Sequence, residues 1–205
     1  MNNTAVLRPP APGSAAASRA LETGLWVFIG VASTLFALFL TAYVMRMDGG
    51  DWSTIALPRQ LWLSSALLLA ASVLLQRAST AARAARWPPA RTLLLAGGAC
   101  TMTFLGVQLW AWQSLLDARV MLAGNPAASF FYVLTALHGL HVLGGLVAWA
   151  ATMPSVAQPA DPDRVTKRIE LCARYWHFLL VVWVVLFATL GWLTPEVVRF
   201  ICGKG

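Results

Sequence analysis

Residues 127–152 read AASFFYVLTALHGLHVLGGLVAWAAT and contain no Asp, Glu, Lys or Arg. The stretch exceeds the about 20 residues that a helix needs to cross a hydrocarbon core about 30 Å thick. Because that core holds no water, backbone polar groups must pair within the segment. The strands of a membrane barrel would instead be about 10 residues long and alternate between apolar and polar side chains. The stretch therefore predicts a transmembrane helix.

Four further uncharged apolar runs lie on either side of it, at residues 24–45, 61–76, 92–116 and 175–195. Together they predict an all-α, polytopic membrane protein built as a bundle of five transmembrane helices. Residues 1–22 are rich in Pro, Ala and Ser, which is typical of a disordered N-terminal tail. We therefore expect a tail over residues 1–22 and a single five-helix domain over residues 23–205.

The composition of the 205-residue chain agrees with a membrane protein. Hydrophobic residues make up 59% of it and charged residues only 11%, against roughly a quarter charged in soluble domains. This excludes a disordered chain and argues against a soluble enzyme. Three cysteines are too few for a disulfide framework.

The net charge of +7 predicts orientation rather than a nucleic-acid partner. Of the fifteen Lys and Arg residues, two lie in the tail and four in each of the loops after the second and fourth runs. All ten would face the same side. Because basic residues accumulate on the cytoplasmic side, we expect a cytoplasmic N-terminus and an external C-terminus.

Three histidines lie inside the expected spans, where polar side chains usually have a function. His138 and His141 are three residues apart and share one helix face, which Gly145 continues. His177 lies at the start of the last run. If that run begins the span, His141 and His177 differ in depth by about 10 Å. This mismatch argues against haem or copper ligation, so we expect no metal site and interpret His138, His141, Gly145 and the mid-span Trp183 as interhelical or subunit packing residues.

A proton or substrate pathway is a second alternative. Relays inside membranes use Asp, Glu or chains of His, but none of the five runs contains a carboxylate. The residues alone thus favour a membrane subunit that packs against partners and lipids. An independent haem-binding protein and a transporter remain as less favoured alternatives.

Two histidine-bearing segments resemble a known family. The sequences FFYVLTALHGLHVLGG at residues 130–145 and YWHFLLVVW at residues 175–183 are similar to subunit III of haem-copper terminal oxidases of the cytochrome c oxidase kind. The sequences WVFIGVASTLFALFLTAY at residues 26–43 and LWLSS at residues 61–65 agree with it. Five helices match the short bacterial form of that family.

The resemblance implies a non-catalytic, multi-pass subunit of a proton-pumping respiratory complex in the bacterial inner membrane, one that passes electrons from cytochrome c to oxygen. Such a subunit packs directly on subunit I, in a complex with subunit II and further small subunits, and supports proton uptake and turnover stability. Its haems and copper lie in the partner subunits, whereas phospholipids bind to it. On this basis Arg174, His177 and Trp62 are expected to contact lipid. Subunit III of a quinol oxidase and an accessory subunit of a nitric oxide reductase are the alternatives.

The chain departs from the family at three membrane positions. Ala32, Ala111 and Leu180 stand where the family commonly has acidic residues. The sequence leaves open the consequence of these replacements, the electron donor, the number of partner subunits and the identity of the lipids.

Overall fold

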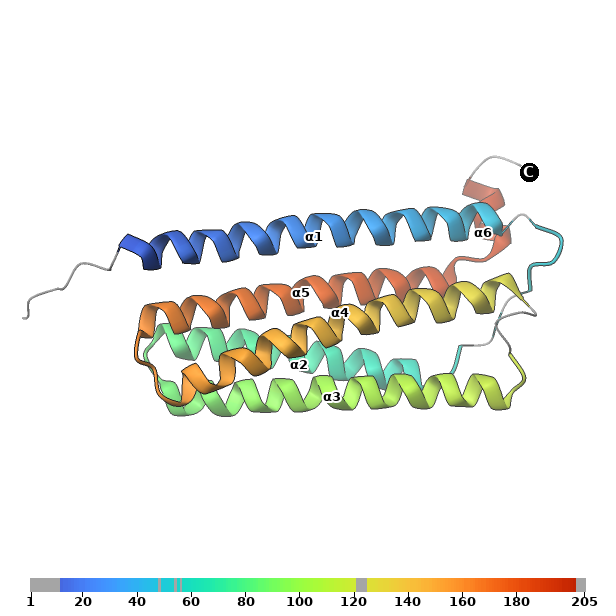
Figure 1. Cartoon of the computed structure of the whole chain (residues 1–205). Helices are drawn as coiled ribbons and strands as arrows, with labels where there is room; N and C mark the ends of the chain where they lie inside the picture. Colours follow the sequence, from blue (N-terminus) through green and yellow to red (C-terminus); the bar gives the residue numbers. More distant parts are fainter. Residues whose placement is uncertain (1–11, 48, 54, 56, 121–124, 202–205) are drawn as a thin grey trace, which may run out of the picture.

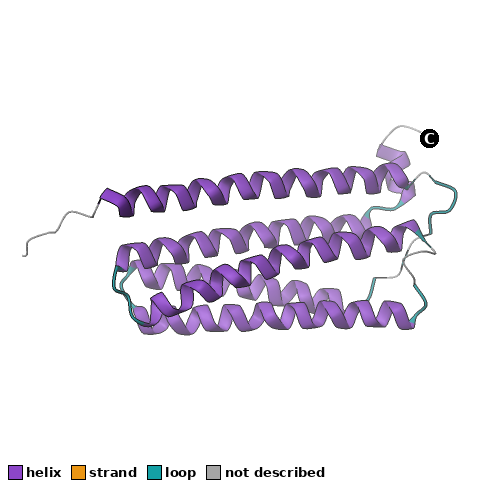
Figure 2. Cartoon of the chain, viewed as in Figure 1, coloured by secondary structure: helices purple, strands orange, loops and turns teal. Residues whose placement is uncertain are grey.

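The computed structural model describes residues 12–47, 49–53, 55, 57–120 and 125–201, and every regular element in these residues is a helix (Figures 1 and 2). Five of the helices are long and apolar enough to cross a membrane, which confirms the predicted all-α class and the five spans. The helices are α1 (Pro12–Arg46), α2 (Gln60–Arg83), α3 (Trp87–Asp117), α4 (Pro126–Ala157), α5 (Pro162–Trp192) and the short α6 (Pro195–Ile201).

Proline lies within the first two residues of four long helices, and α1 is one of them because it begins at Pro12. α3, α4 and α5 each have Pro in their first two positions, where its fixed φ suits the helix and its missing N–H costs nothing. Polar side chains cap two of these starts: Asn125 accepts a hydrogen bond from the Ala127 N–H, and Asp161 accepts one from the Arg164 N–H. The local sequence therefore determines where α4 and α5 begin.

Two helices start earlier than the apolar runs indicate. α1 begins at Pro12 and so includes residues 12–22, while residues 1–11 of the expected tail lie outside the described residues. α5 begins at Pro162, thirteen residues before the run at 175. The Ala-rich segment before α1's apolar run has high helix propensity. A helix also continues through charged turns, because its backbone bonds do not depend on apolar side chains.

α2, α3, α4 and α5 form the body of the bundle, and α1 lies along one side of it (Figure 1). α2 and α3 pack along their length, and α5 packs against both α2 and α4. α1 contacts only α5 and α4 to any extent. In its most apolar window 11% of α1 residues are buried, against 39% in each of the other four spans. Most of α1 therefore faces the surroundings of the bundle.

The connections between the helices place the charged segments at two separate ends. The start of α1, the α2–α3 connection and the α4–α5 connection lie at one end, and α6 lies at the other (Figure 1). We name the end with the start of α1 and the α2–α3 and α4–α5 connections the basic end. It carries the basic residues expected on the cytoplasmic side, apart from Arg8, which is outside the described residues. Lys204, one of the other five Lys and Arg residues, also lies outside them.

Candidate functional site

His138 on α4 lies at the centre of an aromatic cluster. Its side chain is completely buried, and its ring centroid lies 5.1 Å from that of Trp183 on α5, 5.9 Å from Phe104 on α3 and 6.5 Å from Phe36 on α1. The indole N–H of Trp183 donates to Ser65 Oγ on α2 over 2.9 Å. This cluster therefore brings together side chains from all five long helices.

His141, one turn further along α4, faces α1. Its ring lies 5.6 Å from Phe28 and 5.3 Å from Phe36, centroid to centroid. Its Nδ1 lies 2.7 Å from the Leu137 carbonyl oxygen, and because a carbonyl only accepts, Nδ1 carries the proton. Ala32 is buried and lies one turn from both phenylalanines, so this position faces His141.

His177 on α5 faces α2. Its Nδ1 donates to the Ala173 carbonyl oxygen over 2.7 Å and lies 3.3 Å from Ser72 Oγ on α2. The side chain is otherwise exposed on the surface of the bundle. The structure therefore does not bring His177 together with His138 and His141.

The depth argument against a shared metal was wrong. Tyr175 Oη donates to the His141 carbonyl oxygen over 2.9 Å, so His177, two residues later on α5, lies within about a turn of the level of His141. The error arose because α5 begins at Pro162 rather than at Tyr175. His141 and His177 differ in the helices that they face rather than in depth. No group of three or more His, Cys, Asp or Glu suited to a metal occurs among the described residues.

Arg174 joins α5 to α1 near the basic end. Its guanidinium lies 2.9 Å from Glu22 Oε1 and stands over the Trp26 ring at 5.5 Å from the centroid. Lys167 Nζ lies 3.1 Å from the other oxygen of Glu22. The residue expected to bind lipid is thus already paired with a carboxylate of this chain.

Trp62 lies far from Arg174, although both were expected to contact lipid. The indole is 64% exposed and packs edge-on against Phe187, with ring centroids 5.0 Å apart. Phe187 follows Arg174 by thirteen residues, about 20 Å along α5. The expected lipid-contacting residues therefore do not form one site.

An apolar groove of about 530 Å³ lies between α1, α4 and α5. Small residues of α4 form its floor, and Arg168 lies at the edge nearer the start of α5. Its lining residues are Leu21, Leu25, Phe28, Gly144, Ala148, Ala151, Thr152, Arg168, Leu171, Cys172 and Tyr175. This groove fits a long apolar ligand with an anionic end, and the sequence alone did not indicate it because its walls come from three separate helices.

Aromatic side chains of α5 pack tightly against Gly145 on α4. A Cβ atom there would lie 2.9 Å from Tyr175 Cε1 and 3.1 Å from Trp176 Cη2, so no side chain fits without a shift. Trp176 is completely buried and donates from its indole N–H to Thr101 Oγ1 on α3. Trp176 is the second residue of the apolar run at residues 175–195, yet it lies in the core because α5 begins thirteen residues before that run.

The other two positions of the missing acids lie in or against the core. Ala111 on α3 is completely buried, next to Trp112, whose indole N–H donates to Thr135 Oγ1 on α4. Leu180 on α5 is partly buried and packs against the main core. Each acid has thus been replaced by an apolar side chain that fits its surroundings.

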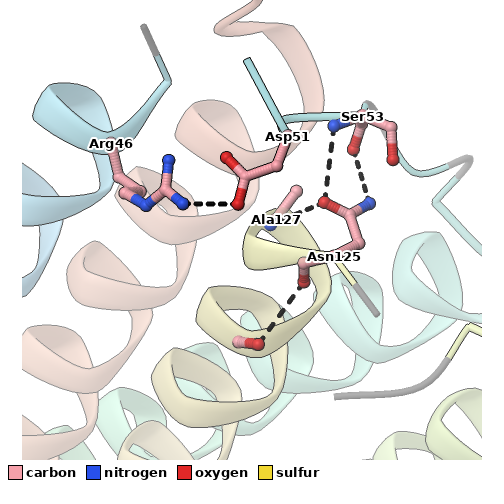
Figure 3. Close-up of polar contacts among 6 residues, drawn as sticks. Arg46, Asp51, Ser53, Asn125 and Ala127 are labelled. Atoms are coloured by element: carbon pink, nitrogen blue, oxygen red, sulfur yellow. Dashed lines mark hydrogen bonds and ion pairs between the residues drawn. The ribbon is translucent and has the colours of Figure 1, made fainter. Parts of the chain in front are cut away.

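Asn125 joins two loops at the end opposite the basic end (Figure 3). Besides capping α4, its amide donates from Nδ2 to the Ser53 carbonyl oxygen over 2.6 Å and accepts from the Ser53 N–H over 3.4 Å. Close by, Arg46 pairs with Asp51 at 2.6 Å and holds the pKa of that carboxyl below its usual range. These contacts fix the α1–α2 connection against the start of α4.

The fold and these contacts define a helical membrane protein whose polar side chains mainly hold helices together. Residues 13–194 match the family described as cytochrome c oxidase subunit III. The chain belongs to this family, and therefore to a multi-subunit oxidase complex.

Individual relatives agree with this assignment. The chain is 31% identical over 170 residues to "Cytochrome c oxidase subunit 3" of Synechocystis sp., covering 80% of this chain and 72% of the relative. It is 26% identical over 174 residues to the protein of the same name from Bacillus sp. strain PS3, covering 80% and 81%. It is also 25% identical over 177 residues to "Probable quinol oxidase subunit 3" of Staphylococcus saprophyticus, covering 81% and 85%.

Proposed function

We propose that this chain is the non-catalytic third subunit of a haem-copper cytochrome c oxidase. It packs directly on subunit I, in a complex with subunit II, in the inner membrane of a bacterium, with its N-terminus in the cytoplasm. In this position it supports proton uptake and the stability of the complex during turnover. The observation that carries the proposal is the family match over nearly the whole five-helix domain.

Purification of the tagged chain in a mild detergent tests the complex. We expect a haem-bearing subunit I to co-purify and the preparation to oxidise reduced cytochrome c. The His177→Ala variant is a control, because His177 contacts only its own bundle among the described residues; it should leave the haem spectrum unchanged. Oxidation of quinol without cytochrome c would assign the chain to a quinol oxidase, and absence of a haem-bearing partner would contradict the proposal.

We further propose that a phospholipid occupies the groove between α1, α4 and α5. The apolar walls suit an acyl chain, and Arg168 at the edge suits a phosphate, which a guanidinium binds with two hydrogen bonds. Arg174, which the sequence led us to expect in contact with lipid, does not line this groove and already pairs with Glu22.

Counting bound phospholipids by native mass spectrometry tests this site. Ala148→Leu, which fills the groove, and Arg168→Gln should each remove one phospholipid from the complex. Arg164→Gln is the matched control, because Arg164 does not line the groove. Unchanged lipid counts in both groove variants would remove the site and would leave the subunit assignment intact.

A further inference from the structure

Three buried polar atoms lack a hydrogen-bond partner among the residues that the structure describes. They are Nδ1 and Nε2 of His138 and Oε1 of Gln108. His138 is 0% exposed and Gln108 is 7% exposed. Polar groups that are buried away from water without a hydrogen bond destabilise a fold. The cost of leaving these atoms unpaired therefore favours a hydrogen-bond partner that is common to His138 and Gln108.

The contacts of neighbouring residues place Gln108 on α3 at about the level of His138 on α4. Phe104, one turn before Gln108 on α3, contacts the ring of His138. Trp112, one turn after Gln108, donates to Thr135, which lies one turn before His138 on α4. Gln108 is therefore flanked on α3 by two residues that both contact α4 near His138.

The directions of helical side chains also incline Gln108 and His138 toward each other. α3 and α4 are consecutive and run antiparallel (Figure 1). Because helical side chains lean toward the N-terminus of their own helix, Gln108 leans toward the level of Phe104 and His138 leans toward the level of Thr135. The amide and the imidazole thus incline toward each other.

The polar groups around them are already engaged. The indole N–H of Trp183, whose ring packs on His138, donates to Ser65 Oγ. The hydroxyl of Thr135 donates to the Phe131 carbonyl oxygen over 2.6 Å and accepts from Trp112. The remaining ring neighbours of His138 are phenylalanines.

We propose that His138 and Gln108 hold a single enclosed water molecule between them. Water donates one hydrogen bond to Gln108 Oε1. At a ring nitrogen of His138 it accepts from the N–H or donates to the lone pair, so either tautomer completes the link. The water then acts as a polar tie between α3 and α4, in a part of the core where the other contacts are aromatic.

A double-mutant cycle on the full chain in detergent tests the link. His138→Phe and Gln108→Leu should each lower the melting temperature by several degrees, because each leaves the other residue's polar atoms unpaired. The double variant should melt above the less stable single variant, since neither orphan remains. As a control, Gln108→Leu combined with His177→Phe should show additive losses, because His177 faces α2. Additive losses for His138 and Gln108 would overturn the pairing.

The unmodified chain supplies an independent test. A map of the purified complex at a resolution that shows ordered water should contain one peak within hydrogen-bond distance of Gln108 Oε1 and of a His138 ring nitrogen. A direct bond between the two side chains, or no peak between them, would overturn the water site.

Discussion

Asn125 links three backbone groups through one side chain, and its two amide atoms have separate roles. Oδ1 caps α4 at Ala127, whereas Nδ2 donates to the Ser53 carbonyl oxygen. Asn125→Ala removes both interactions and should cost about 1–2 kcal/mol of stability. Asn125→Asp keeps the cap acceptor but loses the donor, so it should cost less. Chemical unfolding of the two variants measures the difference, and equal losses would show that the acceptor contacts of Oδ1, including the cap at Ala127, contribute nothing.

Ala32 illustrates the structural effect of a missing acid. The position is buried and faces His141 between Phe28 and Phe36. A carboxylate there would have an imidazole beside it, and buried charges are tolerated when paired. Ala32→Glu should therefore destabilise the chain less than Ala78→Glu, a change at a fully buried position on α2. The thermal stability of both variants decides this, and combining Ala32→Glu with His141→Phe should abolish the difference.

The sequence indicates the general surroundings of a residue, such as the interior of a helix bundle. Trp183 lies in the middle of its apolar run, and its ring contacts Phe104 on α3 and His138 on α4. Specific partners were not predictable, because the sequence does not indicate which helix lies on which side. The pairing of Arg174 with Glu22, separated by 152 residues, is an example.

At the scale of elements, the five spans followed from the apolar runs, but their ends did not. Hydropathy identifies the part of a helix that can lie in the hydrocarbon core of the membrane. The ends of the helix are instead determined by capping residues and by the turns of the connecting loops. α5 includes a charged segment before its apolar run and is therefore 31 residues long. The groove between α1, α4 and α5 lay beyond prediction for a similar reason, because it depends on how three helices are arranged.

The attachment of α1 at the basic end depends on Glu22. This carboxylate pairs with Lys167 and Arg174, both on α5. Glu22→Gln should increase hydrogen exchange in residues 19–30 of α1 and change global stability little, because solvent screens partly exposed ion pairs. Glu170→Gln is the matched control, because Glu170 pairs with Arg83 of α2. Equal exchange in both variants would show that the Glu22 pairs do not hold α1.

At the scale of the whole molecule, the orientation in the membrane stays a prediction. The basic end should face the cytoplasm. In a variant without its own cysteines, Ala85→Cys in the α2–α3 connection should react with an impermeant thiol reagent only after the membrane is opened. Gly50→Cys, in the α1–α2 connection, should react in intact cells. The reverse pattern would invert the topology.

The peripheral position of α1 has a consequence for the order of assembly. The ribosome releases α1 first, yet its partners lie on α4 and α5, which emerge last. Before α4 and α5 are inserted, α1 is an isolated span in the bilayer. α2 and α3, which are consecutive in the chain, can already pack against each other. Contacts between distant segments form late because closing a long loop is slow. Biogenesis of this subunit is therefore expected to end with the docking of its first helix, a step at which an insertase or chaperone has time to act on it.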